Sequence, residues 1–181
     1  MEKDERKFKI LFVCTGNTCR SPMAEGILRK MLKENKLDNF EVSSAGISTF
    51  DGAPPSLFAL EVAKARHVDL TQHRSKQLNK QILSKADLIL VLSAEHMEYI
   101  RKLDKKALEK THLLKTFPPT PSASNEDGKE GVLYIKDPMG GSMDGYNQCF
   151  LEIEKEISRI FPELIDLASK RNLKNQPGSS Q

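Results

Sequence analysis

One short segment of the chain, from Cys14 to Ser21, combines residue types that could carry out nucleophilic chemistry on a bound anion. The guanidinium of Arg20 can bind two phosphate oxygens at once. Gly16 allows a close backbone approach or a positive φ, so the backbone amides of a short loop could also point at the anion. Cys14 would then lie beneath a phosphoryl group, where a thiolate is placed for in-line attack.

The charge of such a loop should act on the thiol itself. We expect the loop amides, Arg20 and a hydrogen bond from Ser21 to lower the pKa of Cys14 from about 8.5 toward about 5 to 6. Considered singly, Cys14 would more often be a core residue and Arg20 a surface residue, but together in a Cys-x5-Arg-Ser segment they favour a functional site. Cys14 and Cys19 lie five positions apart, which is not a usual zinc spacing, and we expect no metal and no cofactor.

The elements on either side must position this segment. Phe8 to Val13 is an apolar run typical of a buried strand, and Ser21-Pro22 is typical of a helix start. The same patterns predict further strands over 40–44, 86–92 and 112–114, and helices over 56–66, 78–85, 94–103 and 143–173. This alternation predicts an α/β fold with a parallel sheet covered on both faces. Ligands of such sheets bind at the carboxyl ends of the strands, where Cys14 and Asp137 could meet.

The composition, with 181 residues of which 38% are hydrophobic, suits one globular domain, which we assign to residues 1–173. Residues 174–181 form a polar stretch that we expect to be a disordered tail, and 117–131 reads as a long loop of open role. The net charge of +3 is too small to indicate a nucleic-acid partner, and no apolar run is long enough to cross a membrane. The lack of a signal peptide and the odd number of cysteines predict a cytoplasmic protein, with Cys149 in the core.

Several segments together resemble a known family. Cys14-Thr15-Gly16-Asn17-Thr18-Cys19-Arg20-Ser21, continued by Pro-Met-Ala-Glu, resembles the phosphate loop of low-molecular-weight protein tyrosine phosphatases. Ser44-Ala45-Gly46, His73-Arg74-Ser75 and Asp137-Pro138 are similar to three further motifs of that family. The resemblance covers most of the chain, and it implies a three-layer αβα sandwich with a four-stranded parallel sheet.

The resemblance also implies catalytic roles. Cys14 would be the nucleophile that forms a phosphocysteine intermediate, and Arg20 the phosphate clamp. Asp137 would be the general acid that protonates the leaving group, and then the base that activates water. From the residues alone, Asp137 would more often be an ordinary turn residue, because it stands in a segment rich in Pro and Gly.

Other residues take supporting roles in the resemblance. The phosphate-binding loop would consist of Thr15, Gly16, Asn17, Thr18, Cys19 and Ser21 around the nucleophile. Asn17 would hold the loop in shape, supported by Ser44 and His73. Cys19 would form a reversible disulfide with Cys14 that protects the nucleophile from over-oxidation. Simple packing of Cys19 beneath the loop is an equally good interpretation.

Two positions bear on the substrate. Thr18 stands where tyrosine-specific members usually carry an aliphatic residue, and Met139 follows Asp137-Pro138 where they usually carry aromatic residues. Both departures resemble the bacterial protein arginine phosphatases, and they suggest that the site has lost its aromatic walls. We therefore expect phosphoarginine in proteins as the substrate, with phosphotyrosine on the same scaffold as the alternative.

Two more distant alternatives also fit an anion-binding loop. A thiol-dependent arsenate reductase would need two further cysteines in the middle of the chain, but Cys149 is the only other cysteine and lies far downstream. A non-catalytic anion-binding module would not need both Cys14 and Asp137. The expected partner is thus a phosphorylated protein, and the sequence predicts no oligomeric state.

Overall fold

A four-stranded parallel sheet forms the centre of the computed structural model, which describes residues 6–119 and 133–174, without the side chains of 172–174. The spatial order is β2-β1-β3-β4. The strands are β1 (Phe8–Cys14), β2 (Phe40–Gly46), β3 (Leu88–Val91) and β4 (Thr111–Leu113). Each lies within two residues of its predicted bounds, and the predicted four-stranded sheet is confirmed.

Helices alternate with these strands as the sequence patterns predict. They are α1 (Arg20–Glu34), α2 (Leu57–Ala65), α3 (Lys80–Lys85), α4 (Ala94–Leu103) and α5 (Met143–Lys174). Two 3₁₀ helices, η1 (Lys105–Lys110) and η2 (Leu114–Thr116), flank β4 and were not predicted. Such short turns have no hydrophobic period that would reveal them in a sequence.

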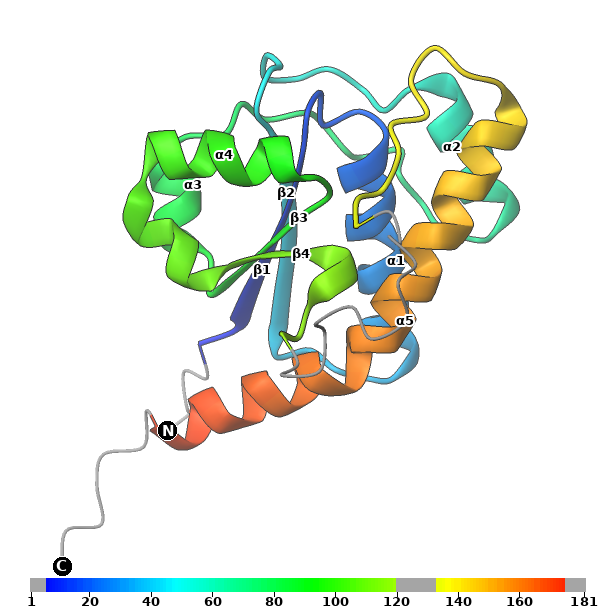
Figure 1. Cartoon of the computed structure of the whole chain (residues 1–181). Coiled ribbons are helices and arrows are strands. Elements are labelled where there is room, and N and C mark those ends of the chain that lie inside the picture. Colours follow the sequence, from blue (N-terminus) through cyan, green and yellow to red (C-terminus); the bar gives the residue numbers. More distant parts are fainter. Residues whose placement is uncertain (1–5, 120–132, 175–181) are drawn as a thin grey trace, which may run out of the picture.

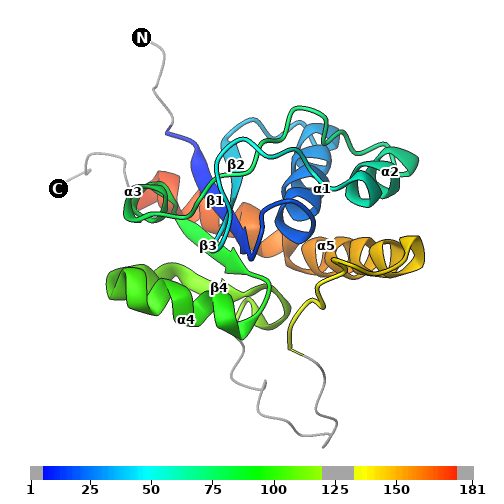
Figure 2. The same ribbon diagram turned by 90° about the horizontal axis from the view of Figure 1, so that it is seen from above.

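The alternation of side chains along β1 divides the core into two layers. Ile10 and Phe12 pack in one cluster with apolar residues of α1, α2 and α5, whereas Leu11 and Val13 pack with residues of α3 and α4. In Figures 1 and 2, α1, α2 and α5 accordingly lie on one side of the sheet and α4 lies on the other. The predicted three-layer αβα sandwich is confirmed.

The long helix α5 brings the end of the chain back across the sheet and packs against α1 and α2. On the apolar face of this helix, the buried residues are Tyr146, Phe150, Ile153, Ile157, Leu164 and Ala168. Phe161 is only partly buried, and its neighbour Ile160 lies in the core. Cys149 is buried in the same cluster, as predicted.

Two predicted segments fall largely outside the described residues. The first is the predicted loop over 117–131, of which only residues 117–119 are described. The second is the predicted tail over 174–181, of which only the helical backbone of Lys174 is described. The single domain over 1–173 stays a prediction. Among the helices that the structure describes, none is long and apolar enough to cross a membrane.

Candidate active site

The segment Cys14 to Ser21 connects the carboxyl end of β1 to the start of α1, because Cys14 is the last residue of β1 and Arg20 the first of α1. A distant part of the chain meets it there. The backbone N–H of Ile135 donates to the carbonyl of Leu92, just after β3, at 2.8 Å. This contact brings Asp137 beside the loop. The segments of Cys14 and Asp137 thus meet at one end of the sheet, as the sequence predicted.

The sulfur of Cys14 is buried and surrounded by donors. It lies 2.8 Å from Oγ of Ser21 and accepts a hydrogen bond from the backbone N–H of Asn17 at 3.2 Å. The side-chain amide of Asn17 donates to the same Ser21 oxygen at 2.9 Å. Since that oxygen already accepts one hydrogen bond, its own proton is free to point at the sulfur.

The expected fall in the pKa of Cys14 is wrong for this arrangement. Burial raises the pKa of the thiol, and this outweighs the opposite effects of Ser21, of the Arg20 charge and of the backbone amides. The positive charge of Arg20 is evident from the sequence, but its partner is not. In the structure that charge is shared with a carboxylate, and the sulfur has almost no contact with solvent.

The partner of Arg20 is Asp137. Nη2 of Arg20 donates to Oδ2 of Asp137 at 2.6 Å and to Oγ1 of Thr15 at 3.1 Å, while Nη1 donates to the carbonyl of Ile135 at 3.1 Å. The side chain of Arg20 is only 4% exposed, whereas that of Asp137 is 42% exposed. The guanidinium is therefore fixed from several directions, and the carboxylate stands at its outer edge.

Asn17, not Gly16, provides the left-handed backbone of the loop. Asn17 has a φ of 52°, whereas the φ of Gly16 lies outside the positive region. The Asn17 amide stabilises this conformation, because its two N–H groups donate to Ser21 and Ser44, and its oxygen accepts from the backbone N–H of Lys76. The glycine that the loop does require is Gly46, where a Cβ would lie 2.7 Å from the carbonyl oxygen of Thr15.

Ser44 and His73 both contact Asn17, as the resemblance implied. Oγ of Ser44 accepts from the Asn17 side chain at 2.9 Å, and Nε2 of His73 donates to the Asn17 carbonyl at 2.8 Å. The residue that joins them ends the Pro-Met-Ala-Glu stretch of the loop motif, but the sequence alone assigned it no role. Glu25 of α1, which is buried, accepts from Ser44 and lies 3.6 Å from Nδ1 of His73. Burial alone would raise the pKa of Glu25, but His73, Ser44 and Arg29 together hold it below its ordinary value.

A second missed group supports Thr15. The backbone N–H of Ser93 donates to Nδ1 of His96, so the ring proton lies on Nε2, which is 3.0 Å from Oγ1 of Thr15. The Thr15 hydroxyl in turn donates to Oε1 of Glu95 at 3.0 Å. Burial, assisted by the charge of Arg20, lowers the pKa of His96 to about 3, so this ring is neutral. A Glu-His pair at a helix start carries no signal in the sequence that would have revealed this role.

Cys19 lies on the inner side of the loop, facing α5 and the start of α2. Its sulfur is 3.3 Å from the hydroxyl of Tyr146 and 3.3 Å from that of Ser56, and it is a free thiol, as is Cys14. Thr18, next to it, is partly exposed, and its carbonyl accepts from the backbone N–H of Ser56. Burial and the contact with Cys19 raise the pKa of Tyr146 to about 12.

The surroundings are less poor in aromatic side chains than the segment after Asp137 suggested. Met139 itself is exposed, and only its backbone contacts Asp137. Phe58 of α2 packs edge-on against Tyr146 with 5.4 Å between ring centroids. Phe50, which is exposed, extends from the segment after β2 whose Ser48 N–H donates to the Thr15 carbonyl. Both aromatic residues stand on segments that hydrogen-bond to the loop, and sequence reasoning overlooked them.

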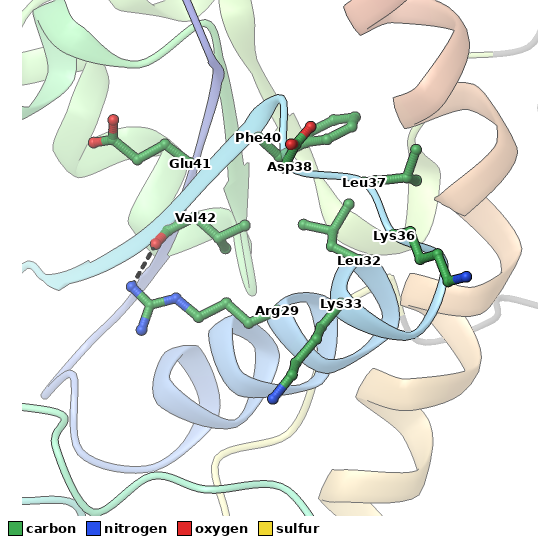
Figure 3. A pocket seen from close by; sticks show the side chains of 9 residues that line it. All are labelled: Arg29, Leu32, Lys33, Lys36, Leu37, Asp38, Phe40, Glu41 and Val42. Carbon is green, nitrogen blue, oxygen red and sulfur yellow. Dashed lines mark hydrogen bonds between the residues drawn. The ribbon is translucent and has the colours of Figure 1, made fainter.

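The loop around Cys14 lies far from a large groove that other described residues form. Figure 3 shows this groove, of about 600 Å³, between the later turns of α1 and the first residues of β2. Arg29, Leu32 and Phe40 line it, and Arg29 donates to the Val42 carbonyl at 2.8 Å. The start of β2 is the opposite end of the sheet from Cys14.

Within residues 6–119 and 133–174, no group of three or more Cys, His, Asp or Glu side chains is arranged to hold a metal ion.

Comparison with known proteins agrees with this geometry. A family described as low molecular weight phosphotyrosine protein phosphatase matches residues 9–173 of the chain. The chain belongs to this phosphatase family. The resemblance stated from the loop and the Asp-Pro segment is thereby confirmed, and the chain is an enzyme of a hydrolase family.

The relatives include both substrate branches of this phosphatase family. The protein-arginine-phosphatase of Geobacillus stearothermophilus is 38% identical over 158 residues, which cover 87% of this chain and 96% of the relative. A low molecular weight protein-tyrosine-phosphatase of Streptomyces coelicolor is 31% identical over 153 residues, covering 81% and 87%. A solved structure of the YwlE arginine phosphatase, a cysteine-to-serine mutant with a phosphorylated active site serine, has 31% identity and a TM-score of 0.72, covering 93% of this chain and 97% of that one.

Proposed function

We propose that the chain is a cysteine-dependent protein phosphatase that acts on phosphoarginine in proteins through a phosphocysteine on Cys14. The observation that carries this proposal is the convergence of the loop that holds Cys14 and Arg20 with the distant segment that holds Asp137, at one end of the sheet. A nucleophile, an anion clamp and a proton donor are the three groups that phosphoryl transfer through a covalent intermediate requires. A cytoplasmic location belongs to the same proposal.

The reaction would have two steps. In the first, the thiolate of Cys14 attacks phosphorus, the P–N bond breaks, and Asp137 in its protonated form donates its proton to the departing nitrogen. In the second, Asp137 takes a proton from water while the water oxygen attacks phosphorus, the S–P bond breaks and inorganic phosphate leaves. Arg20 would stabilise the charge on the phosphoryl oxygens in both steps. Asn17, with Ser44 and His73 behind it, would keep the loop in the shape that this attack requires.

The choice of phosphoarginine rests on Thr18, on Met139 and on the arginine phosphatases among the relatives. Thr18 is partly exposed. Its hydroxyl could hydrogen-bond to a substrate guanidinium, whereas an aliphatic side chain at this position could not. The second candidate substrate is phosphotyrosine. Phe50 and Phe58, which are both exposed, favour it because they could pack on an aromatic ring.

The deciding experiment compares kcat/KM on a phosphoarginine peptide and on a phosphotyrosine peptide, in the wild type and in Thr18→Ile. We expect the wild type to prefer phosphoarginine and Thr18→Ile to shift the preference toward phosphotyrosine. Cys14→Ser should remove both activities, which shows that they share one site. A wild type that prefers phosphotyrosine would leave the phosphatase chemistry intact and overturn the proposed substrate.

A further inference from the structure

Glu95, at the start of α4, places a second carboxylate beside the phosphate-binding loop. Oγ1 of Thr15 lies 3.0 Å from Oε1 of Glu95 and 3.1 Å from Nη2 of Arg20, so one hydroxyl separates the carboxylate from the guanidinium. Asp137 lies 2.6 Å from the same nitrogen of Arg20. Two carboxylates from different segments therefore lie near the guanidinium that would hold phosphoryl oxygens, Asp137 in direct contact and Glu95 through the Thr15 hydroxyl.

The negative charge of Glu95 has no cationic partner among the described residues. Its nearest basic group is the ring of His96 at 3.4 Å, but burial keeps that ring neutral. The charge of Arg20 is already paired with Asp137. The Glu95 side chain is 64% exposed, and the contacts within the described chain use only Oε1, which leaves Oε2 available to a ligand. The rim of the site therefore carries one uncompensated carboxylate.

We infer that Glu95 is a specificity-determining residue that binds the guanidinium of a phosphoarginine substrate; this rests on the proposed function. The N–H groups of a guanidinium form a planar fork that fits the two oxygens of a carboxylate. Asp137 has to serve the nitrogen that leaves phosphorus. Glu95 is the second carboxylate within reach, and it can accept the remaining N–H groups.

The charge of Glu95 should act in opposite directions on the two candidate substrates. A phosphoryl dianion with an uncharged leaving group, such as an aryl phosphate, gains nothing from a carboxylate beside the loop and is repelled by it. Phosphoarginine carries a compensating positive charge next to its phosphorus, so the same carboxylate attracts it. Removal of the Glu95 charge should consequently weaken activity on phosphoarginine and strengthen it on an aryl phosphate.

The test measures kcat and KM for a phosphoarginine peptide and for 4-nitrophenyl phosphate in the wild type and in Glu95→Gln. The glutamine keeps an oxygen that accepts from Thr15, so the loop retains its support. We expect kcat/KM to fall roughly three- to tenfold on phosphoarginine, mainly through KM, and to rise up to about threefold on the aryl phosphate, as befits an exposed charge. Both changes should shrink at 0.5 M salt, where exposed charges are screened.

The matched control is Glu98→Gln, which removes the same charge from the same helix at a residue paired with Arg101 instead of Thr15. It should leave the ratio of the two activities unchanged. If Glu95→Gln lowers both activities in the same proportion, the residue only supports Thr15 and the inference is overturned. A wild type that hydrolyses the aryl phosphate but not phosphoarginine would instead overturn the proposed substrate itself, and with it this role of Glu95.

Discussion

Nη2 of Arg20 lies 2.6 Å from Oδ2 of Asp137, so the two charged groups that the proposed reaction uses separately are bonded to each other. Phosphoryl oxygens would compete with this carboxylate for the same edge of the guanidinium, because each group can place two anionic oxygens against its N–H groups. An anion that takes over Arg20 would release Asp137 toward the leaving group. Phosphate binding and readiness of the acid would then be linked through one ion pair.

This linkage predicts two opposite effects of Asp137→Asn. Hydrolysis of aryl phosphates with poor leaving groups should slow by roughly 10²- to 10³-fold, and good leaving groups should be affected far less, because only the former need the proton. Inhibition by inorganic phosphate should become tighter, since its competitor for Arg20 has lost its charge. Equal slowing across the series would remove the role of Asp137 as acid. Asp144→Asn, an exposed change in the first turn of α5, is the control.

The pH dependence of Cys14 gives a second prediction. Because burial raises its pKa while Ser21 and Arg20 lower it, alkylation by iodoacetamide should show an apparent pKa above the ordinary thiol value. Ser21→Ala should raise this pKa further, since the sulfur loses a donor. Asp137→Asn should lower it, since the charge of Arg20 then acts on the sulfur without compensation. A wild-type pKa near 6 would contradict the balance and restore the expectation from sequence.

The sequence was sufficient for the fold because strands and helices here have clear periods. The apolar run of β1 was recognisable, and the Cys-x5-Arg segment marked the end of the first strand. What could not be predicted depends on distant contacts. Arg20 and its partner Asp137 are more than a hundred residues apart in the sequence. Glu95 and His96 look like ordinary helix residues until the fold brings them to the loop, and the role of Glu25 depends on its contact with Ser44 of β2.

The support of Asn17 by Ser44 gives a third prediction with a built-in control. Ser44 faces the loop from β2, whereas its neighbour Ser43 points to the other side of the strand and is exposed. Ser44→Ala should lower kcat by roughly tenfold with little change in KM, because Asn17 and Glu25 each lose one hydrogen bond and the loop loses its fixed shape. Ser43→Ala should leave kcat unchanged. Equal effects of the two changes would show that the loop is held without Ser44.

Oxidation by peroxide tests the proposed redox role of Cys19. If Cys19 resolves an oxidised Cys14 as a disulfide, inactivation of the wild type should be reversed by dithiothreitol, and in Cys19→Ser it should become permanent. Cys149→Ser is the control, because this third free cysteine belongs to α5 and is buried in the core. Recovery of Cys19→Ser to the same extent as the wild type would leave Cys19 with a packing role only, next to Tyr146 and Ser56.

His96 should make folding stability depend on pH in the acid range. Its pKa is lowered to about 3 in the folded chain, against an ordinary value of 6.5, so the unfolded chain binds the proton more tightly. The stability that the neutral ring contributes is present above pH 6.5 and is lost as the pH falls toward 3, by up to roughly 1.4 kcal/mol per pH unit. In His96→Gln, urea unfolding should show a flatter decline of the unfolding free energy over this range. His67→Gln, at an exposed position, should retain the wild-type slope; identical slopes in all three proteins would show that His96 is not the group responsible.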